Sequence, residues 1–172
     1  AAAEAPEAHE SSPQLAALAR ANALGDRLVQ LAPERGSYRI LQLTALLEAA
    51  QTQIGFAEQL PDEAGETLPE DLHTLERILE FALANRHPGA ALAAIRMLAA
   101  RGGAELVHSG SGRPRPLVRG LRSPDAHVRF AAAQAILKLD PREPYAGSSA
   151  LPRTLAHAIR AAGTPRALVV HP

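Results

Sequence analysis

The 172-residue chain contains no cysteine and no tryptophan, and its only aromatic residues besides histidine are three Phe and two Tyr. The lack of cysteine excludes disulfide bonds, thiolate nucleophiles and cysteine-based zinc sites. No stretch reaches the roughly 18 consecutive apolar residues of a membrane-spanning helix. The scarcity of aromatic residues also argues against a β-sandwich, because its strands favour β-branched and aromatic side chains. The core must therefore be built from smaller apolar residues.

Hydrophobic residues make up 47% of the chain, and most of them are Ala and Leu. Both are strong helix formers, and the small Ala side chain lets helices approach closely. We therefore predict an all-α fold. The first residue is Ala rather than Met, so a removed leader peptide and an excised segment both stay open, and the compartment is not defined.

The formal charge of zero conceals an asymmetry between the two halves of the chain. Residues 1–85 carry 14 acidic and 5 basic side chains, a balance of −9, whereas residues 86–172 carry 4 acidic and 13 basic, a balance of +9. Such asymmetry can indicate a protein that binds an acidic partner or nucleic acid, or one that self-associates through its opposite ends. Drift in surface composition is the plainer explanation, and it stays open.

Proline, glycine and polar clusters divide the chain into segments. Residues 1–13 contain no apolar side chain larger than Ala or Pro, which predicts a flexible tail. Residues 14–60 predict a pair of helices, separated by a break that contains Pro33 and Gly36. One side of the first helix carries Ala17, Ala21, Leu24, Leu28 and Leu31. An acidic linker with a proline near each end follows at 61–70.

Five further helices are predicted over 72–85, 89–101, 115–122, 124–138 and 150–162. Between the second and third of these, the polar run from His108 to Arg113 predicts a flexible connection. For the fourth, Ser123 is the expected N-cap and Pro124 the first helical residue, with Asp125 facing the positive helix end.

These helices repeat at a fixed interval. Leu79, Leu117 and Leu155 are each 38 residues apart, and so are Leu83, Leu121 and Ile159. The second helices agree, with a spacing of 38 between Ala94 and Ala132 and between Leu98 and Ile136. A period of this length with two helices per unit predicts an α-solenoid, in which each unit buries its apolar side against its neighbours.

Residues 116–141 (PLVRGLRSPDAHVRFAAAQAILKLDP) resemble a HEAT repeat of the phycobilisome-lyase-like subtype. The resemblance lies in the Leu-rich first helix, the Ser123-Pro124-Asp125 turn, Val128-Arg129, and the run from Ala132 to Ile136. The subtype has Asp where this chain has Ser123, which puts an Asp–Arg ladder between repeats in doubt. The resemblance implies HEAT-like repeats over residues 71–163, whereas 14–60 fit a HEAT-like or a tetratricopeptide-like pair equally.

Residues 164–172 (TPRALVVHP) are a proline-led apolar run that is similar to the first strand of a receiver-like domain. The acidic pair that binds magnesium in such domains is replaced by His171-Pro172, so the resemblance does not imply that function. It implies a short extended segment at the junction to a truncated following domain. A docked or disordered tail is the alternative.

No motif supports catalysis, a cofactor or a metal. His73, Glu76 and Glu80 share one helical face, but a solvated polar face explains them better than metal binding. The run from His108 to Arg113 (HSGSGR) lacks the strand and the GK[ST] sequence of a phosphate-binding loop. We therefore expect a protein that is not an enzyme and that has no catalytic, cofactor-binding or metal-ligating residues.

The binding residues that we predict are arginines. Arg77, Arg115 and Arg153 are 38 apart and precede the repeated Leu by two residues, which is about 200° around a helix, so they should point outward. Arg119 and Arg122 extend this stripe. Arginine pairs with carboxylates and phosphates in bidentate fashion. Solubilising surface residues are the alternative, since the chain has 17 Arg and one Lys.

These features favour a non-catalytic interaction scaffold within a larger regulatory or signalling-like protein. Its expected partner is another protein or an adjacent domain of the same polypeptide. The alternative is binding of nucleic acid or an acidic ligand by the basic C-terminal half. Nucleic acid is disfavoured because the chain lacks aromatic stacking platforms and has a neutral overall charge.

Overall fold

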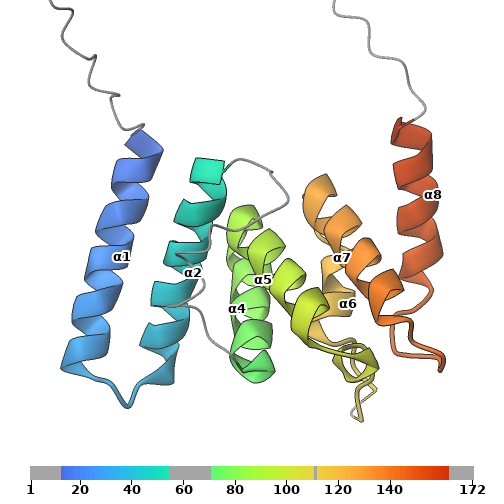
Figure 1. The fold of residues 1–172 in the computed structure, drawn as a ribbon, viewed down its shortest axis with the longest axis horizontal. Coiled ribbons are helices and arrows are strands. Elements are labelled where there is room, and N and C mark those ends of the chain that lie inside the picture. Colours follow the sequence, from blue (N-terminus) through green and yellow to red (C-terminus); the bar gives the residue numbers. More distant parts are fainter. Residues whose placement is uncertain (1–12, 55–70, 111, 163–172) are drawn as a thin grey trace, which may run out of the picture.

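The computed structural model describes residues 13–54, 71–110 and 112–162, and this part of the chain is all-α, as predicted (Figure 1). The predictions for the tail (except Pro13), for the linker at 61–70 and for the strand at 164–172 lie outside the described residues. The helices are α1 (Pro13–Leu31), α2 (Gly36–Ile54), α4 (Leu72–Asn85), α5 (Pro88–Arg101), α6 (Pro116–Gly120), α7 (Ala126–Leu139) and α8 (Ala150–Ala162), with a 3₁₀ turn, η1 (Ala104–Leu106), after α5.

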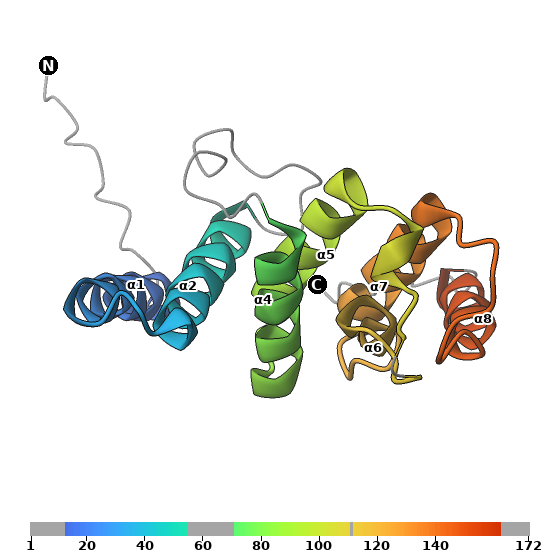
Figure 2. The ribbon, with the colours of Figure 1, turned by 90° about the horizontal axis from the view of Figure 1, so that it is seen from below.

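The helices form a row along the long axis of the molecule, and α4 to α7 lie in two layers (Figures 1 and 2). One layer contains α5 and α7, and the other contains α4 and α6. Helix α5 packs against its hairpin partner α4 and also against α2 and α7, while α4 packs against α6. Helix α5 is therefore the central element of the row.

The core consists of aliphatic side chains from α2, α4, α5, α6 and α7, as the composition requires. Burial of each large aliphatic side chain contributes about 1.5–3 kcal/mol. Alanine and glycine permit the close approach of helices: a Cβ atom at Gly120 of α6 would lie 3.0 Å from Cβ of Ala132 in α7. The largest fully buried residues include Leu43, Leu47, Leu75, Ile78, Leu79, Leu92, Ile95, Leu98, Leu117 and Ile136.

The start of α7 differs from the prediction. The helix begins at Ala126, and its N-cap is Asp125, whose Oδ1 accepts a hydrogen bond from the Val128 N–H at 3.0 Å. Ser123, the predicted cap, accepts a hydrogen bond at Oγ from the Asp125 N–H at 3.3 Å. Both residue types cap helices well, but the carboxylate also places negative charge at the positive helix end.

The connection between α5 and α6 contributes to the core just before the run from His108 to Arg113, which was predicted to be flexible. Leu106 at the end of η1 is 2% exposed and Val107 is fully buried. These two apolar residues anchor a segment whose other residues are mostly polar or small. The polar composition of the stretch therefore concealed its packing.

The apolar side assigned to α1 by helical spacing is largely exposed in the structure. Leu24 is 59% exposed and Leu31 is 81% exposed. Helix α1 stands at one end of the row and packs on α2, so one of its sides lacks a neighbouring helix among the described residues. The apolar spacing predicted the helix correctly, but it did not predict that this side of the helix is exposed.

Candidate interaction surface

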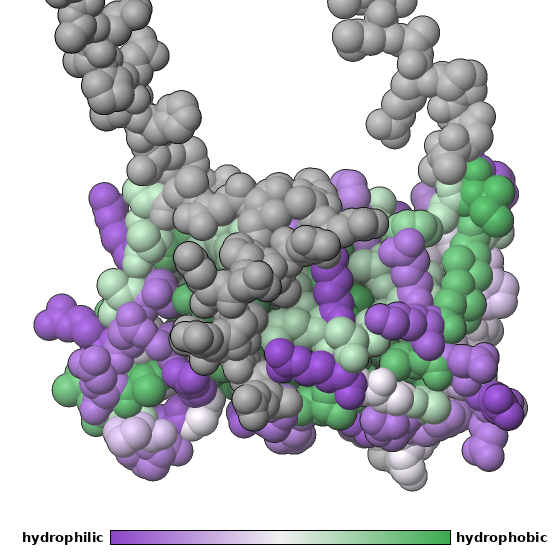
Figure 3. Space-filling view, viewed as in Figure 1, coloured by the Kyte–Doolittle hydropathy of each residue, from purple (hydrophilic) through white to green (hydrophobic). Residues whose placement is uncertain are grey.

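The face formed by α5 and α7 carries two grooves that lie side by side. Figure 3 shows this face in the orientation of Figure 1, with hydrophobic residues gathered along the right edge, over α8. One groove lies between α5 and α7 and has a volume of about 440 Å³. The other lies between α7 and α8 and has a volume of about 480 Å³. His127 and Phe130 of α7 line both.

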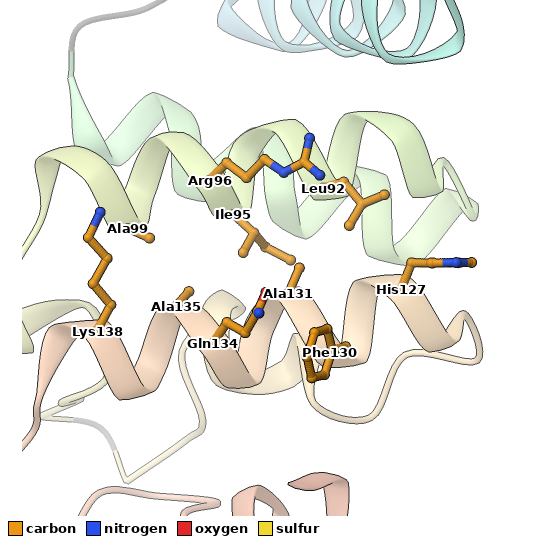
Figure 4. Close-up of a pocket in the computed structure, with 10 residues that line it drawn as sticks. All are labelled: Leu92, Ile95, Arg96, Ala99, His127, Phe130, Ala131, Gln134, Ala135 and Lys138. Carbon is orange, nitrogen blue, oxygen red and sulfur yellow. The ribbon is translucent and has the colours of Figure 1, made fainter. Parts of the chain in front are cut away.

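Small side chains create the groove between α5 and α7. Ala99 of α5 and Ala131 and Ala135 of α7 line it, and their side chains are too short to fill the space between the two helices. Ile95 points into this space from α5, while Phe130 lies on α7 farther from α5 than Ala131 does (Figure 4). The groove thus has an apolar floor that α5 and α7 form together.

Basic side chains rim the same groove. Lys138 stands at one end and His127 at the other, and Arg96 extends along α5 (Figure 4). The Arg96 guanidinium donates a hydrogen bond from Nη1 to Oε1 of Gln51 at 3.2 Å, which steadies it on the α5 side. No Asp or Glu is among the residues that line the groove. Its surroundings therefore favour a ligand that combines apolar and negatively charged groups.

The groove between α7 and α8 is more apolar. Phe130 is 43% exposed, and Ile159 of α8 is 73% exposed. Leu155 is partly buried and packs against the core. Large exposed apolar side chains that gather on one face are typical of interaction sites. Phe130 joins the two grooves into one surface.

The five arginines predicted to form a binding stripe do not share one environment. Arg115, just before α6, forms a bidentate ion pair with Glu76 of α4, with Nε donating to Oε1 at 2.8 Å and Nη2 pairing with Oε2. Arg119 of α6 pairs with Glu80 of α4, with 2.6 Å between Nη1 and Oε1. These two charges are already matched by carboxylates of the neighbouring helix pair.

The other three predicted arginines are exposed. Arg77 lies in α4 near Gly36, where its Nη1 would be 3.5 Å from a Cβ atom on that glycine. Arg122 follows α6 and Arg153 belongs to α8. Arg122 lines a small cleft with Arg119 and Pro124. The structure thus brings Arg119 and Arg122 together, but it engages Arg115 and Arg119 in ion pairs.

Comparison with known protein families, curated proteins and solved structures gives no match.

Two weaker features of the sequence have plain structural explanations. Glu76 and Glu80 face arginines of the next helix pair, and His73 is exposed. In the described part of the chain, no cluster of three or more His, Asp or Glu residues could hold a metal ion. None of the described helices has the length and hydropathy to cross a membrane.

The residues that line the α5–α7 groove were not predicted from the sequence. The sequence nevertheless contains one indication of the groove, at Phe130. This residue lies off the helical stripe formed by Val128, Ala132 and Ile136, which are buried. A large aromatic residue outside the core stripe of an amphipathic helix indicates either a neighbouring helix or a ligand. The rim residues carry no such signal, since Arg96 and Lys138 are ordinary charges on helices.

Proposed function

We propose that this chain is a non-catalytic protein-interaction scaffold, built from HEAT-like repeats that stack as an α-solenoid with a period of 38. It forms part of a larger regulatory or signalling-like protein. Its binding surface is the face made by the second helices of successive repeats. An elongated surface of this kind binds partners without any reactive residue.

The bounds of the second helices support the period. Helix α5 covers Pro88–Arg101 and α7 covers Ala126–Leu139, so both their starts and their ends are 38 residues apart. Leu98 and Ile136, which occupy one repeat position, are both fully buried. The first helices agree less closely: Leu79 and Leu117 are fully buried, whereas Leu155 is only partly buried against the core.

The observation that carries the proposal is the apolar, basic-rimmed groove between α5 and α7. It lies between two helices that occupy the same position in consecutive units. Its floor leaves Phe130 partly exposed. A solvent-exposed aromatic residue within a groove is a typical anchor for a protein partner.

Site-specific photo-crosslinking in cells that produce the full-length protein tests this function. A photoreactive amino acid is placed at Gln134 in the groove and, in a second variant, at Arg77 on α4 in the other layer. We expect the same protein adducts in repeated captures from Gln134 and none from Arg77. The absence of adducts at both positions would contradict the scaffold function.

The alternative, binding of nucleic acid or an acidic ligand by the basic half, has weaker support. Arg122 and Arg153 are exposed and able to contact phosphates. However, the ion pairs of Arg115 and Arg119 with Glu76 and Glu80 compete with phosphate binding at the centre of the stripe. Duplex binding that weakens steeply with salt and is lost in an Arg122→Glu, Arg153→Glu variant would favour this alternative.

A further inference from the structure

We propose that the groove between α5 and α7 binds an acidic amphipathic helix of a partner protein. The inference rests on the proposed function and deepens it by naming the chemistry of the partner. Three properties of the groove lead to it: an apolar floor, walls made of two helices, and a rim that carries basic but no acidic side chains.

The floor requires apolar side chains on the ligand. Ile95 lies at the bottom, almost completely buried, and Phe130 lines the α7 side of the groove with 43% of its surface exposed. Leu92, Ala99, Ala131 and Ala135 complete the apolar lining. Covering this surface removes apolar area from water, which is the main source of affinity at such sites.

The walls favour a helix over an extended peptide. The backbone groups in the middle of α5 and α7 are hydrogen-bonded within their own helices, so they offer few partners to another backbone. An extended segment buried there would leave its own N–H and C=O groups unsatisfied, which is costly. A helix satisfies its backbone internally, and side chains spaced i, i+3 and i+7 fit between two existing helices.

The rim requires negative charge on the flanks of that helix. Arg96 lies on the α5 side, and Lys138 and His127 lie at opposite ends on the α7 side (Figure 4). The Asp125 carboxylate lies just outside, with Oδ1 3.8 Å from Nδ1 of His127, and it also caps α7 through the Val128 N–H. Glutamate or aspartate side chains along both edges of the ligand would meet the charged Arg96 and Lys138, whereas lysines would be repelled by them.

Three synthetic helical peptides test the proposal with the whole chain by fluorescence polarisation. The first carries Leu at i, i+3 and i+7 with Glu on both flanks. The second keeps the Leu face and replaces Glu with Lys, and the third keeps Glu and replaces Leu with Ala. We expect the first peptide to bind at least about tenfold more tightly than either of the others. Equal binding of the Glu and Lys peptides would overturn the proposal.

Variants of the protein locate the site. Phe130→Ser should weaken binding of the Glu peptide about tenfold. The matched control is Leu137→Ser, because Leu137 is also exposed on α7, at 53%, but lies outside the groove. Equal losses in the two variants would place binding elsewhere. Circular dichroism and thermal melting of each variant separate a binding loss from unfolding.

A charge exchange tests the role of the rim. Lys138→Glu should weaken binding of the Glu peptide and strengthen binding of the Lys peptide. Arg142→Glu, in the exposed loop that follows α7, should change the binding of neither peptide. The same response in both variants would show that only the overall charge matters, which contradicts the proposal.

The identity of the protein captured in the crosslinking experiment distinguishes a failure of this proposal from a failure of the scaffold function. Adducts captured at Gln134 that contain no acidic amphipathic segment would overturn the inferred chemistry and leave the scaffold intact. Tight, Phe130-dependent binding of the Glu peptide without any captured protein would overturn the scaffold and support the inferred chemistry of the groove.

Discussion

At the scale of residues, two ion pairs with the same sequence separation differ in burial. Glu76 with Arg115 and Glu80 with Arg119 both join residues 39 apart on α4 and at α6. The side chains of the first pair are 10% and 33% exposed, and those of the second are 56% and 45% exposed. Solvent screens the second pair far more strongly, so only the first should contribute measurably to stability.

Glu76→Gln should therefore destabilise the protein by about 1–2 kcal/mol, because it leaves the Arg115 guanidinium partly buried without its carboxylate. The hydrogen bonds that Arg115 donates to the Glu76 carboxylate raise the pKa of Arg115, while desolvation lowers it. The guanidinium stays charged at any working pH. The matched Glu80→Gln should cost less than about 0.5 kcal/mol. Urea denaturation measures both, and equal costs would contradict the difference in burial.

Asp71 provides a prediction about pH. Its carboxylate caps α4 by accepting a hydrogen bond from the Thr74 N–H at 2.6 Å, and this bond holds the pKa of Asp71 below its usual value. A lowered folded-state pKa means that the stabilisation is complete above the unfolded pKa of about 3.9 and is lost as pH falls through the folded value. Asp71→Ala should cost about 1 kcal/mol at neutral pH.

The cost of Asp71→Ala should then shrink as the pH falls from about 5 to about 2. Asp71→Asn keeps a capping oxygen but has no titratable group, so its stability relative to Asp71→Ala should not vary with pH. Urea denaturation of the three proteins across this range gives the comparison. A constant difference between the native protein and Asp71→Ala would refute a contribution from the charged carboxylate.

The sequence predicted the positions of these arginines but not their partners. Helical spacing places Arg115 and Arg119 outward from the repeated Leu, and the structure puts both against α4. Their partners, the carboxylates of Glu76 and Glu80, lie 39 residues earlier in the sequence. The spacing of these two residues along one helix indicated only a polar face. A contact between separate helices depends on their packing, and one-dimensional spacing does not contain that information.

At the scale of elements, α5 depends on α2 for its N-terminal cap. His87, at the N-cap position of α5, makes no side-chain capping hydrogen bond. Instead, Oε2 of Glu48 in α2 accepts a hydrogen bond from the Ala90 N–H at 2.6 Å. Gly89 permits this approach, since a Cβ atom there would lie 2.9 Å from the same oxygen. Helix α7, in contrast, carries its own cap, Asp125.

Glu48→Ala should therefore destabilise the protein by about 1 kcal/mol, because an N-terminal N–H of α5 loses its acceptor and the helix end loses a negative charge. Glu48→Gln should cost about half as much, since it keeps an oxygen acceptor. Glu34→Ala, at an exposed position between α1 and α2, serves as the control. Chemical denaturation measures all three, and a neutral Glu48→Ala variant would contradict capping between helices.

Helix positions were largely predictable because proline, glycine and apolar spacing act locally. The starts and ends of α4, α5 and α8 agree closely with prediction, and α7 begins later because Asp125, two residues after Ser123, caps the helix in its place. What covers each helix was less predictable. The exposed side of α1 and the buried Leu106 and Val107 both depend on neighbours that local patterns do not identify.

At the scale of the whole molecule, the row of helices limits how far a local change can act. Helix α5 contacts α2, α4 and α7, while α1 packs on α2 and α8 on α7. Leu47 lies buried in α2, and Ile136 lies buried in α7, the neighbour of α5 on the other side. In a molecule whose units touch mainly their neighbours, a defect near one end should loosen that end first.

Leu47→Ala and Ile136→Ala should each cost about 2–5 kcal/mol, because each removes a fully buried side chain and leaves a cavity. Hydrogen–deuterium exchange with mass spectrometry should then show opposite patterns. Leu47→Ala should accelerate exchange most in α1 and α2, and Ile136→Ala most in α7 and α8, with α5 affected less in both. Uniform acceleration by either variant would mean that the helices open as one cooperative unit, which would contradict the stacking of semi-independent repeats from which the proposed binding face is built.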